Sequence, residues 1–252
     1  MNADYEIRAY FRTLYAAWGD QHWWPAESEF EVIVGAYLTQ NTSWTNVEQA
    51  LQRLRTARVL SVNGIRRTSL RKLERLIRSS GYFRQKAQRL KTFVEFLDKR
   101  YAGSLTRMFA QPTATLREEL LSLNGVGPET ADSILLYAGN RPSFVVDAYT
   151  RRILERHSLI ASTATYEDIR QLFHRALGPL AAENLECATG EKTGPVGSCH
   201  VPSNMSTAKR EALVQIFNEM HGLIVGVGKT YCKRSQTDCE RCPLNKFLPA
   251  QE

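Results

Sequence analysis

The stretch LNGVGPETA at residues 123–131 constrains the fold more than any other part of the sequence. Gly125 and Gly127 bracket one apolar residue, Val126, and Pro128 follows directly. Proline is favoured at the first position of a helix, because the N–H that it lacks would have no partner there. Glycine lets the backbone approach a ligand closely. The stretch therefore predicts a tight turn between two helices, with Val126 in the core and outward-facing N–H groups that suit a phosphate.

Hydrophobic periodicity indicates helices along most of the chain. Apolar residues recur at helical spacing, as in Val47, Leu51 and Leu54, whereas the alternation typical of strands is almost absent outside residues 144–146. We expect an all-α fold of about ten or more short helices. Residues 183–206 break the pattern with several glycines and prolines, so we expect a long loop or insertion there.

The charge of the chain favours a polyanionic partner. Lysine and arginine number 33 against 26 for aspartate and glutamate, which gives a formal net charge of +7. A basic excess favours nucleic acid, because contacts with phosphates release counterions. No apolar run reaches the length of a membrane span, and the N-terminus lacks the shape of a signal peptide. We therefore expect a monomeric cytoplasmic protein without membrane contact, nucleoid-associated if bacterial.

Asp147 is the candidate catalytic residue. It follows the apolar residues 144–146 and precedes a helical pattern, a position that by itself is better explained as a helix N-cap. Together with the turn at 123–131, however, it resembles the helix-hairpin-helix–GPD superfamily of DNA glycosylases, the relatives of endonuclease III and MutY. Residues 30–42 (FEVIVGAYLTQNT) resemble the family's first barrel helix and base-flipping turn, and residues 81–87 (GYFRQKA) resemble its G-x-[YF]-x-x-K-A element.

The resemblance implies a two-lobed all-α protein with the helix-hairpin-helix glycosylase fold. One lobe, over residues 27–139, would be a six-helix barrel that contains the helix-hairpin-helix. The other lobe would be discontinuous, over residues 1–26 and 140–252, and would hold the C-terminal cysteines. The active-site cleft would lie between the lobes, with the hairpin and Asp147 at its mouth.

The resemblance also implies a base-excision mechanism. The damaged base would be flipped out of double-stranded DNA, and Gln40 would fill the gap that it leaves. Asp147 would stabilise the positive charge that develops on the sugar and activate the attacking water, as carboxylates do in glycoside hydrolysis. The hairpin residues that would contact the DNA backbone are Asn124, Gly125, Val126, Gly127, Glu129 and Thr130.

The sequence departs from the bifunctional relatives at Glu129. In those relatives this position is a lysine, whose amine attacks the sugar and leads to strand cleavage. A glutamate cannot form a Schiff base. We therefore predict a monofunctional glycosylase without an efficient AP-lyase step, and we expect the charge of Glu129 to suit the first turn of its helix.

Three tryptophans bear on the substrate. Trp23 and Trp24, in the sequence HWWP, and Trp44, after the turn that contains Gln40, resemble most the 3-methyladenine glycosylases of the MagIII type. In that group, residues matching one of the Trp23–Trp24 pair and Trp44 hold the flipped base between them. An alkylated purine is cationic and electron-poor, so aromatic faces attract it. The alternative is that these side chains serve only in packing.

We therefore predict release of an alkylated purine such as 3-methyladenine, with three alternatives. A mismatch glycosylase for thymine, uracil or adenine would also lack the lysine. An endonuclease III-like protein would be both a glycosylase and an AP lyase. A damage-binding protein on the same scaffold would not be an enzyme, although the intact Asp147 argues against it.

The C-terminal cysteines predict a cofactor site. Cys232, Cys239 and Cys242 have the spacing of the first three ligands in the family's C-x6-C-x2-C-x5-C loop, but Leu248 stands where the fourth cysteine would be. The resemblance implies a [4Fe–4S] cluster with a structural role. Zinc, bound by four cysteines or by three and a histidine, and loss of the metal are the alternatives. The candidates for the fourth ligand are Cys199, Cys187, His200 and a nearby carboxylate.

Overall fold

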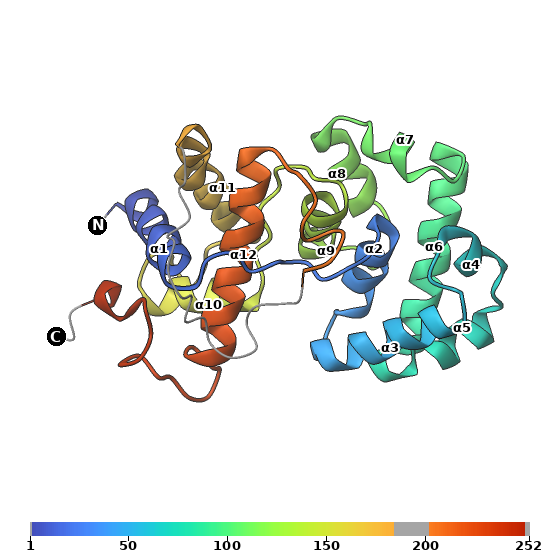
Figure 1. Ribbon diagram of the computed structural model, residues 1–252, viewed down its shortest axis with the longest axis horizontal. Helices are drawn as coiled ribbons and strands as arrows, with labels where there is room; N and C mark the ends of the chain where they lie inside the picture. Colours follow the sequence, from blue (N-terminus) through green and yellow to red (C-terminus); the bar gives the residue numbers. More distant parts are fainter. Residues whose placement is uncertain (1, 184–201, 250–252) are drawn as a thin grey trace. The chain divides into compact units, whose positions relative to one another are not determined.

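The computed structural model describes residues 2–183 and 202–249 (Figure 1). These residues form helices and loops without a β-strand, apart from an isolated bridge between Cys232 and Thr237. The prediction of an all-α fold is confirmed. Most of the expected insertion, residues 184–201, lies outside the described residues. No described helix is both long and apolar enough to cross a bilayer.

The chain divides into two compact units, which we call the continuous unit, Ala26–Arg141, and the split unit, Met1–Pro25 with Pro142–Glu252. The helices of the continuous unit are α2 (Glu29–Leu38), α3 (Trp44–Thr56), α4 (Val62–Arg67), α5 (Leu70–Leu76), η1 (Arg78–Ser80), α6 (Phe83–Tyr101), α7 (Leu105–Phe109), α8 (Thr113–Leu121), α9 (Pro128–Ser133) and η2 (Ile134–Ala138). The described helices of the split unit are α1 (Ala3–Trp18), α10 (Ala148–Arg156), α11 (Tyr166–Leu177), η3 (Gly178–Ala182), α12 (Ala212–Thr230) and η4 (Asn245–Phe247).

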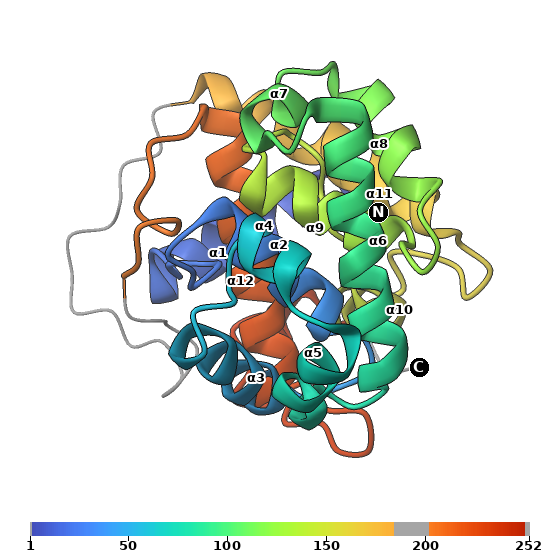
Figure 2. The same ribbon diagram turned by 90° about the vertical axis from the view of Figure 1, so that its right-hand side faces the viewer.

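Helix α2 is the centre of the continuous unit. Its sequence is apolar apart from Glu29 and Glu31 in the first turn, and every residue from Phe30 to Leu38 is buried, as expected for a helix that other helices surround. It contacts α3, α6, α9 and η2. Helix α6, the longest helix of this unit, packs in turn against α4 and α5 (Figure 2). The hairpin helix α9 is therefore built directly onto the core of its unit.

Lys86 gives the element at residues 81–87 a structural role. Its buried Nζ atom donates hydrogen bonds to the carbonyl oxygens of Leu38, 2.8 Å away, and Ser80, 2.6 Å away. These carbonyls lie at the ends of α2 and η1, where helix geometry leaves them without an internal partner. Burial, with the nearby charge of Arg89, lowers the pKa of Lys86 to about 8.

Helix α12 is the central helix of the split unit. Its residues from Ile216 to Gly228 are buried, and it contacts α1, α10, α11 and η3 (Figure 1). Gly228 lets α10 approach closely, because a Cβ atom there would lie 2.2 Å from the ring of Tyr149. Buried polar side chains require partners, so the presence of His221 in this enclosed stretch calls for a specific contact.

Candidate active site

The turn at residues 123–131 joins α8 to α9 in the continuous unit. Helix α8 ends at Leu121, and Pro128 is the first residue of α9. Val126 is buried, and its N–H donates to the carbonyl oxygen of Leu123 at 3.1 Å. The turn therefore has the backbone geometry that its glycines and proline favour.

The two glycines of the turn serve different purposes. Gly125 has a φ of +79°, and a Cβ atom there would lie 1.9 Å from Nε of Arg89, so the fold itself requires glycine at this position. Gly127 has an ordinary φ of −92°, and beyond its two chain neighbours no described atom lies within 4 Å of the place where its Cβ would be. The space above Gly127 is therefore open to another molecule.

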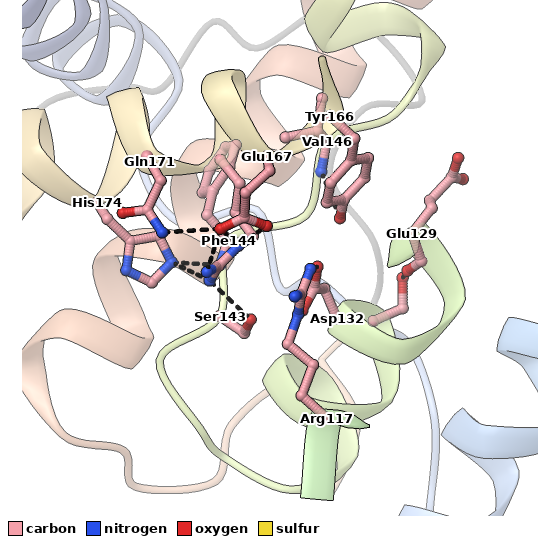
Figure 3. Close-up of polar contacts among 12 residues, drawn as sticks. Arg117, Glu129, Asp132, Ser143, Phe144, Val146, Tyr166, Glu167, Gln171 and His174 are labelled. Carbon is pink, nitrogen blue, oxygen red and sulfur yellow. Dashed lines mark hydrogen bonds and ion pairs between the residues drawn. The ribbon is translucent and has the colours of Figure 1, made fainter. Parts of the chain in front are cut away.

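A buried ion pair holds together the two helices that flank the turn. Arg117 of α8 donates from Nε and Nη2 to the two carboxylate oxygens of Asp132 on α9, at 2.8 and 3.0 Å (Figure 3). Asp132 is fully buried, and the Arg117 side chain is 19% exposed. Two-point pairs of this kind are geometrically specific, and breaking a buried pair costs about 3–5 kcal/mol. The pair therefore fixes α9 against α8.

Gln40 lies against the hairpin. Its Nε2 atom donates to the carbonyl oxygen of Gly125 at 3.0 Å and to Oγ1 of Thr130 at 2.9 Å. Its Oε1 atom accepts from Nη1 of Arg89 at 2.8 Å. Both ends of the amide are engaged within the continuous unit, so insertion of this side chain into a duplex would require these bonds to break. The wedge role of Gln40 stays a prediction, and its observed role is to tie the end of α2 to the hairpin.

Asp147 is the N-cap of α10 in the split unit. Its Oδ1 atom accepts from the N–H of Thr150 at 2.7 Å and from the Thr150 hydroxyl at 2.9 Å. Its Oδ2 atom faces Nε2 of His221 on α12 at 3.6 Å. Burial would raise the pKa of Asp147, but the contacts with His221 and Thr150 outweigh it and hold that pKa below its ordinary value. The carboxylate is therefore ionised at neutral pH.

Helix α11 holds the backbone that precedes Asp147 (Figure 3). The N–H of Phe144 donates to Nε2 of His174 at 3.2 Å, and the N–H of Val146 donates to the hydroxyl of Tyr166 at 3.3 Å. Both acceptor side chains come from α11. Alternate residues of the extended segment are thus attached to one helix, which fixes the point at which Asp147 begins α10.

Two of the three candidate tryptophans belong to the split unit. Trp23 and Trp24 are buried, and their rings meet edge to face with centroids 5.8 Å apart. The ring of Trp23 also meets that of His221 edge to face at 5.9 Å, and Nζ of Lys229 lies 5.6 Å from the Trp23 centroid. Trp23 is therefore the tryptophan that these contacts connect to Asp147, through His221.

Trp44 belongs to the continuous unit, where it is the first residue of α3. Its indole N–H donates to Oε1 of Glu48, one turn later, at 2.7 Å. The assignment of Trp44 to a base pocket stays a prediction.

The sequence analysis did not identify His221 or Arg89 as site residues. For His221 a signal was available, because it is a lone histidine within an apolar helical run.

The three C-terminal cysteines follow α12. Among the described residues, no group of three histidine, cysteine, aspartate or glutamate side chains is placed to hold a metal ion. Sγ of Cys232 instead accepts from Nη1 of Arg156 at 3.1 Å, and burial raises the pKa of Cys242 to about 11. The nearby Cys232 and Cys239 also raise that pKa, which means that the three thiols lie near one another. The iron–sulfur or zinc site therefore stays a prediction. The other candidate ligands, outside the described residues, are Cys187, Cys199 and His200.

Comparison with protein families matches residues 34–179 to the HhH-GPD superfamily base excision DNA repair protein family. A Methanocaldococcus jannaschii protein that carries the provisional name DNA repair glycosylase is 39% identical, over 94% of this chain and 93% of its own length. The endonuclease III of Thermotoga maritima is 28% identical, over 85% of this chain and 80% of its own length.

Solved structures are similar over nearly the whole chain. The 3-methyladenine DNA glycosylase MagIII of H. pylori, bound to 1,N6-ethenoadenine, is 27% identical with a TM-score of 0.70, and the match covers 90% of this chain and 97% of MagIII. A non-covalent endonuclease III–DNA complex also has a TM-score of 0.70, covering 98% of this chain and 96% of that protein. Its identity is 19%, so this second similarity concerns the fold alone.

Proposed function

Since this chain belongs to the HhH-GPD superfamily of base excision DNA repair proteins and is a DNA glycosylase of that superfamily, we propose that it hydrolyses the N-glycosidic bond of an alkylated purine such as 3-methyladenine. The proposal depends chiefly on the contact of Trp23 with His221, whose Nε2 atom lies 3.6 Å from Oδ2 of Asp147. This contact links an aromatic ring to the candidate catalytic carboxylate within one unit. The similarity to a 3-methyladenine glycosylase supports the same substrate class.

In the proposed reaction, the flipped nucleotide brings its sugar against Asp147. Cleavage of the glycosidic bond develops oxocarbenium-like charge on the sugar, which an ionised carboxylate stabilises. Oδ1 of Asp147 is engaged with Thr150, so Oδ2 is the oxygen that faces the sugar or accepts a proton from the attacking water. Glu129 offers no amine for a Schiff base. The products are therefore the free base and an abasic site in an intact strand.

The hairpin is the proposed contact with the DNA backbone. Asn124 lines a hollow of about 590 Å³ that it shares with Arg84 and Arg89 of α6, whose charges suit phosphates. The open space above Gly127 would let a phosphate approach the backbone of the turn. Double-stranded DNA that contains a damaged base is thus the expected partner.

Gly127→Ala is expected to weaken DNA binding roughly tenfold or more, the equivalent of one charge-assisted hydrogen bond. The loss of stability should stay within about 1 kcal/mol, because alanine is only a poorer N-cap of α9 and its methyl group meets no described atom within 4 Å beyond the two chain neighbours. Gly125→Ala is the contrasting variant. Alanine is strained at the positive φ of this residue and would clash with Arg89, so the free energy of unfolding should fall by about 1–2 kcal/mol or more. Thermal melting measures the stability of both variants, and fluorescence anisotropy with abasic-site DNA measures their affinity. Unchanged affinity in Gly127→Ala would contradict a close approach of DNA there.

A base-release assay tests the substrate class. We expect release of methylated purines from alkylated DNA, and no release from uracil DNA or from T:G and A:8-oxoguanine mismatches. Activity on a mismatch alone would replace the proposal with a mismatch glycosylase. Tight binding to damaged DNA with no release of any base would replace it with a damage-binding protein.

The metal content of the full chain tests the cofactor prediction separately. A [4Fe–4S] cluster would give about four iron atoms per chain and a brown protein. Its fourth ligand would then be identified by loss of iron in either Cys187→Ser or Cys199→Ser. A colourless protein free of iron and zinc would exclude both metal sites. No step of the proposed reaction is assigned to this loop.

A further inference from the structure

The two oxygens of the Asp147 carboxylate have different surroundings. Oδ1 accepts both hydrogen bonds from Thr150 and so caps the first turn of α10. Oδ2 faces His221, and the side chains of Asp147 and His221 are only 13% and 5% exposed. A helix cap needs one carboxylate oxygen. Oδ2 is thus the oxygen that the proposed reaction can use, and His221 is the side chain that faces it.

The imidazole ring of His221 is held by aromatic neighbours. The rings of Trp23 and Phe144 each meet it edge to face, with centroids 5.9 and 6.3 Å away. The residue lies in the enclosed part of α12, so its ring cannot turn without moving these neighbours. Phe144 itself belongs to the segment that leads into Asp147 and is attached to His174. The same backbone therefore positions the imidazole and the carboxylate.

The separation of Nε2 and Oδ2 suits a bond that closes during the reaction. At 3.6 Å it exceeds the usual N–H···O distance of about 2.7–3.2 Å. Hydrogen bonds of catalytic groups are often long in the free enzyme and tighten when substrate is bound. A shift of about half an ångström would bring His221 within hydrogen-bond distance of the carboxylate.

The helices that carry or adjoin the pair bear other titratable or charged side chains. They include Tyr149 of α10 with Arg152 over its ring, Lys229 and Glu219 of α12, and His174 and Arg170 of α11. Glu219 is engaged with the backbone N–H of Gln21 at 2.7 Å, and Lys229 lies over Trp23. Within the described part of the chain, His221 is the basic side chain within ion-pair distance of Asp147.

We propose that His221 is a positioning residue that orients Oδ2 of Asp147 toward the sugar and keeps the carboxylate ionised. This inference rests on the proposed function, in which Asp147 performs the hydrolysis. The same imidazole packs against Trp23, so a movement of the Trp23 ring would move His221 and thereby change the orientation of the carboxylate. A flipped base that displaces Trp23 is thereby coupled to the orientation of Asp147.

His221→Phe tests the role kinetically, because it keeps a ring but removes the donor. The kcat for base release should fall about tenfold or more, part of the 10²–10⁴-fold that a positioned acid or base contributes, while the affinity for DNA stays unchanged. The acid limb of the pH–rate profile should move to higher pH, since Asp147 loses a contact that lowers its pKa. His221→Gln, whose amide N–H can donate, should recover part of the rate.

His157→Gln is the matched control. His157 is also a buried histidine of the split unit, paired with the hydroxyl of Tyr10 at 2.6 Å. Its loss should lower the melting temperature and leave the acid limb in place. If the acid limb of the pH–rate profile moved equally in His221→Phe and His157→Gln, the shift would be a general effect of losing a buried histidine, and the positioning role of His221 would be overturned.

Carbon-13 NMR titration of the Asp147 carboxyl group tests the contact without DNA, with Asp147→Asn assigning the signal. The pKa of Asp147 should lie below its ordinary value in the wild type and rise in His221→Phe. An unchanged pKa together with an unchanged kcat in that variant would overturn the inference. If the wild type released no base while the pKa still rose, the proposed function would fail and the contact between His221 and Asp147 would stand.

Discussion

Asp147→Asn is expected to reduce the single-turnover rate of base release by about 10²–10⁴-fold, the usual contribution of a positioned acid or base. Asparagine is as good an N-cap as aspartate, so the hydrogen bond from the Thr150 N–H can be kept. The substitution removes the negative charge that would stabilise the sugar cation, together with the base for the attacking water. Thermal melting and DNA affinity should therefore stay close to the wild-type values.

Asp168→Asn is the matched control for this experiment. Asp168 belongs to the capping box at the start of α11 in the split unit, where it accepts from the N–H and hydroxyl of the N-cap residue Thr165 at 2.8 and 2.7 Å. Loss of its charge should change stability slightly and leave base release intact. Retention of more than about a tenth of the rate in Asp147→Asn would contradict the catalytic role, because it amounts to less than about 1.4 kcal/mol of transition-state stabilisation.

Glu129→Lys is expected to create a covalent intermediate that the wild type lacks. Glu129 is an exposed residue next to Pro128 in the first turn of α9. A lysine there would present an amine able to form a Schiff base with the sugar. Borohydride reduction in the presence of substrate DNA should therefore trap a protein–DNA adduct with the variant and none with the wild type, as seen on a denaturing gel.

Glu129→Gln separates the two consequences of that substitution. It removes the negative charge without adding an amine. Any gain in DNA affinity that comes from loss of the charge should therefore appear in both variants, whereas the trapped adduct should form only with Glu129→Lys. An adduct formed by the wild-type protein would show a lyase step that uses another amine, and the monofunctional proposal would then be wrong.

The hairpin could be predicted because its determinants are local. Two glycines, one apolar residue and Pro128 specify a turn and a helix start through the conformations that their own backbones allow. The all-α fold could be predicted for a related reason, since the period of the apolar residues reports which faces must be buried. Asp147 was correctly placed before a helix, and its function as the N-cap follows from the same local rule.

The partners of the site side chains could not be predicted in this way. Gln40 is predicted to fill the gap in the duplex, and in the free protein its amide contacts Gly125, Thr130 and Arg89, which are 85, 90 and 49 residues away in the chain. Such contacts depend on which helices pack together, and no periodicity within α2 encodes them. The partner of His221 could not be predicted either. Within the sequence of α12 it is an ordinary buried residue, and only the packing of α10 against α12 brings it close to Asp147.

Sequence therefore settled the backbone elements of this DNA glycosylase and the residue types that its chemistry needs, because turn and helix preferences act between neighbours in the chain. Tertiary structure alone decided how those residues are used. It placed Arg89 directly against Gly125 and left the space at the Cβ position of Gly127 unoccupied by described atoms beyond its chain neighbours. It also engaged one oxygen of Asp147 in a helix cap. It turned the other oxygen toward His221, because the packing of α12 against α10 brings together side chains that are far apart in the chain.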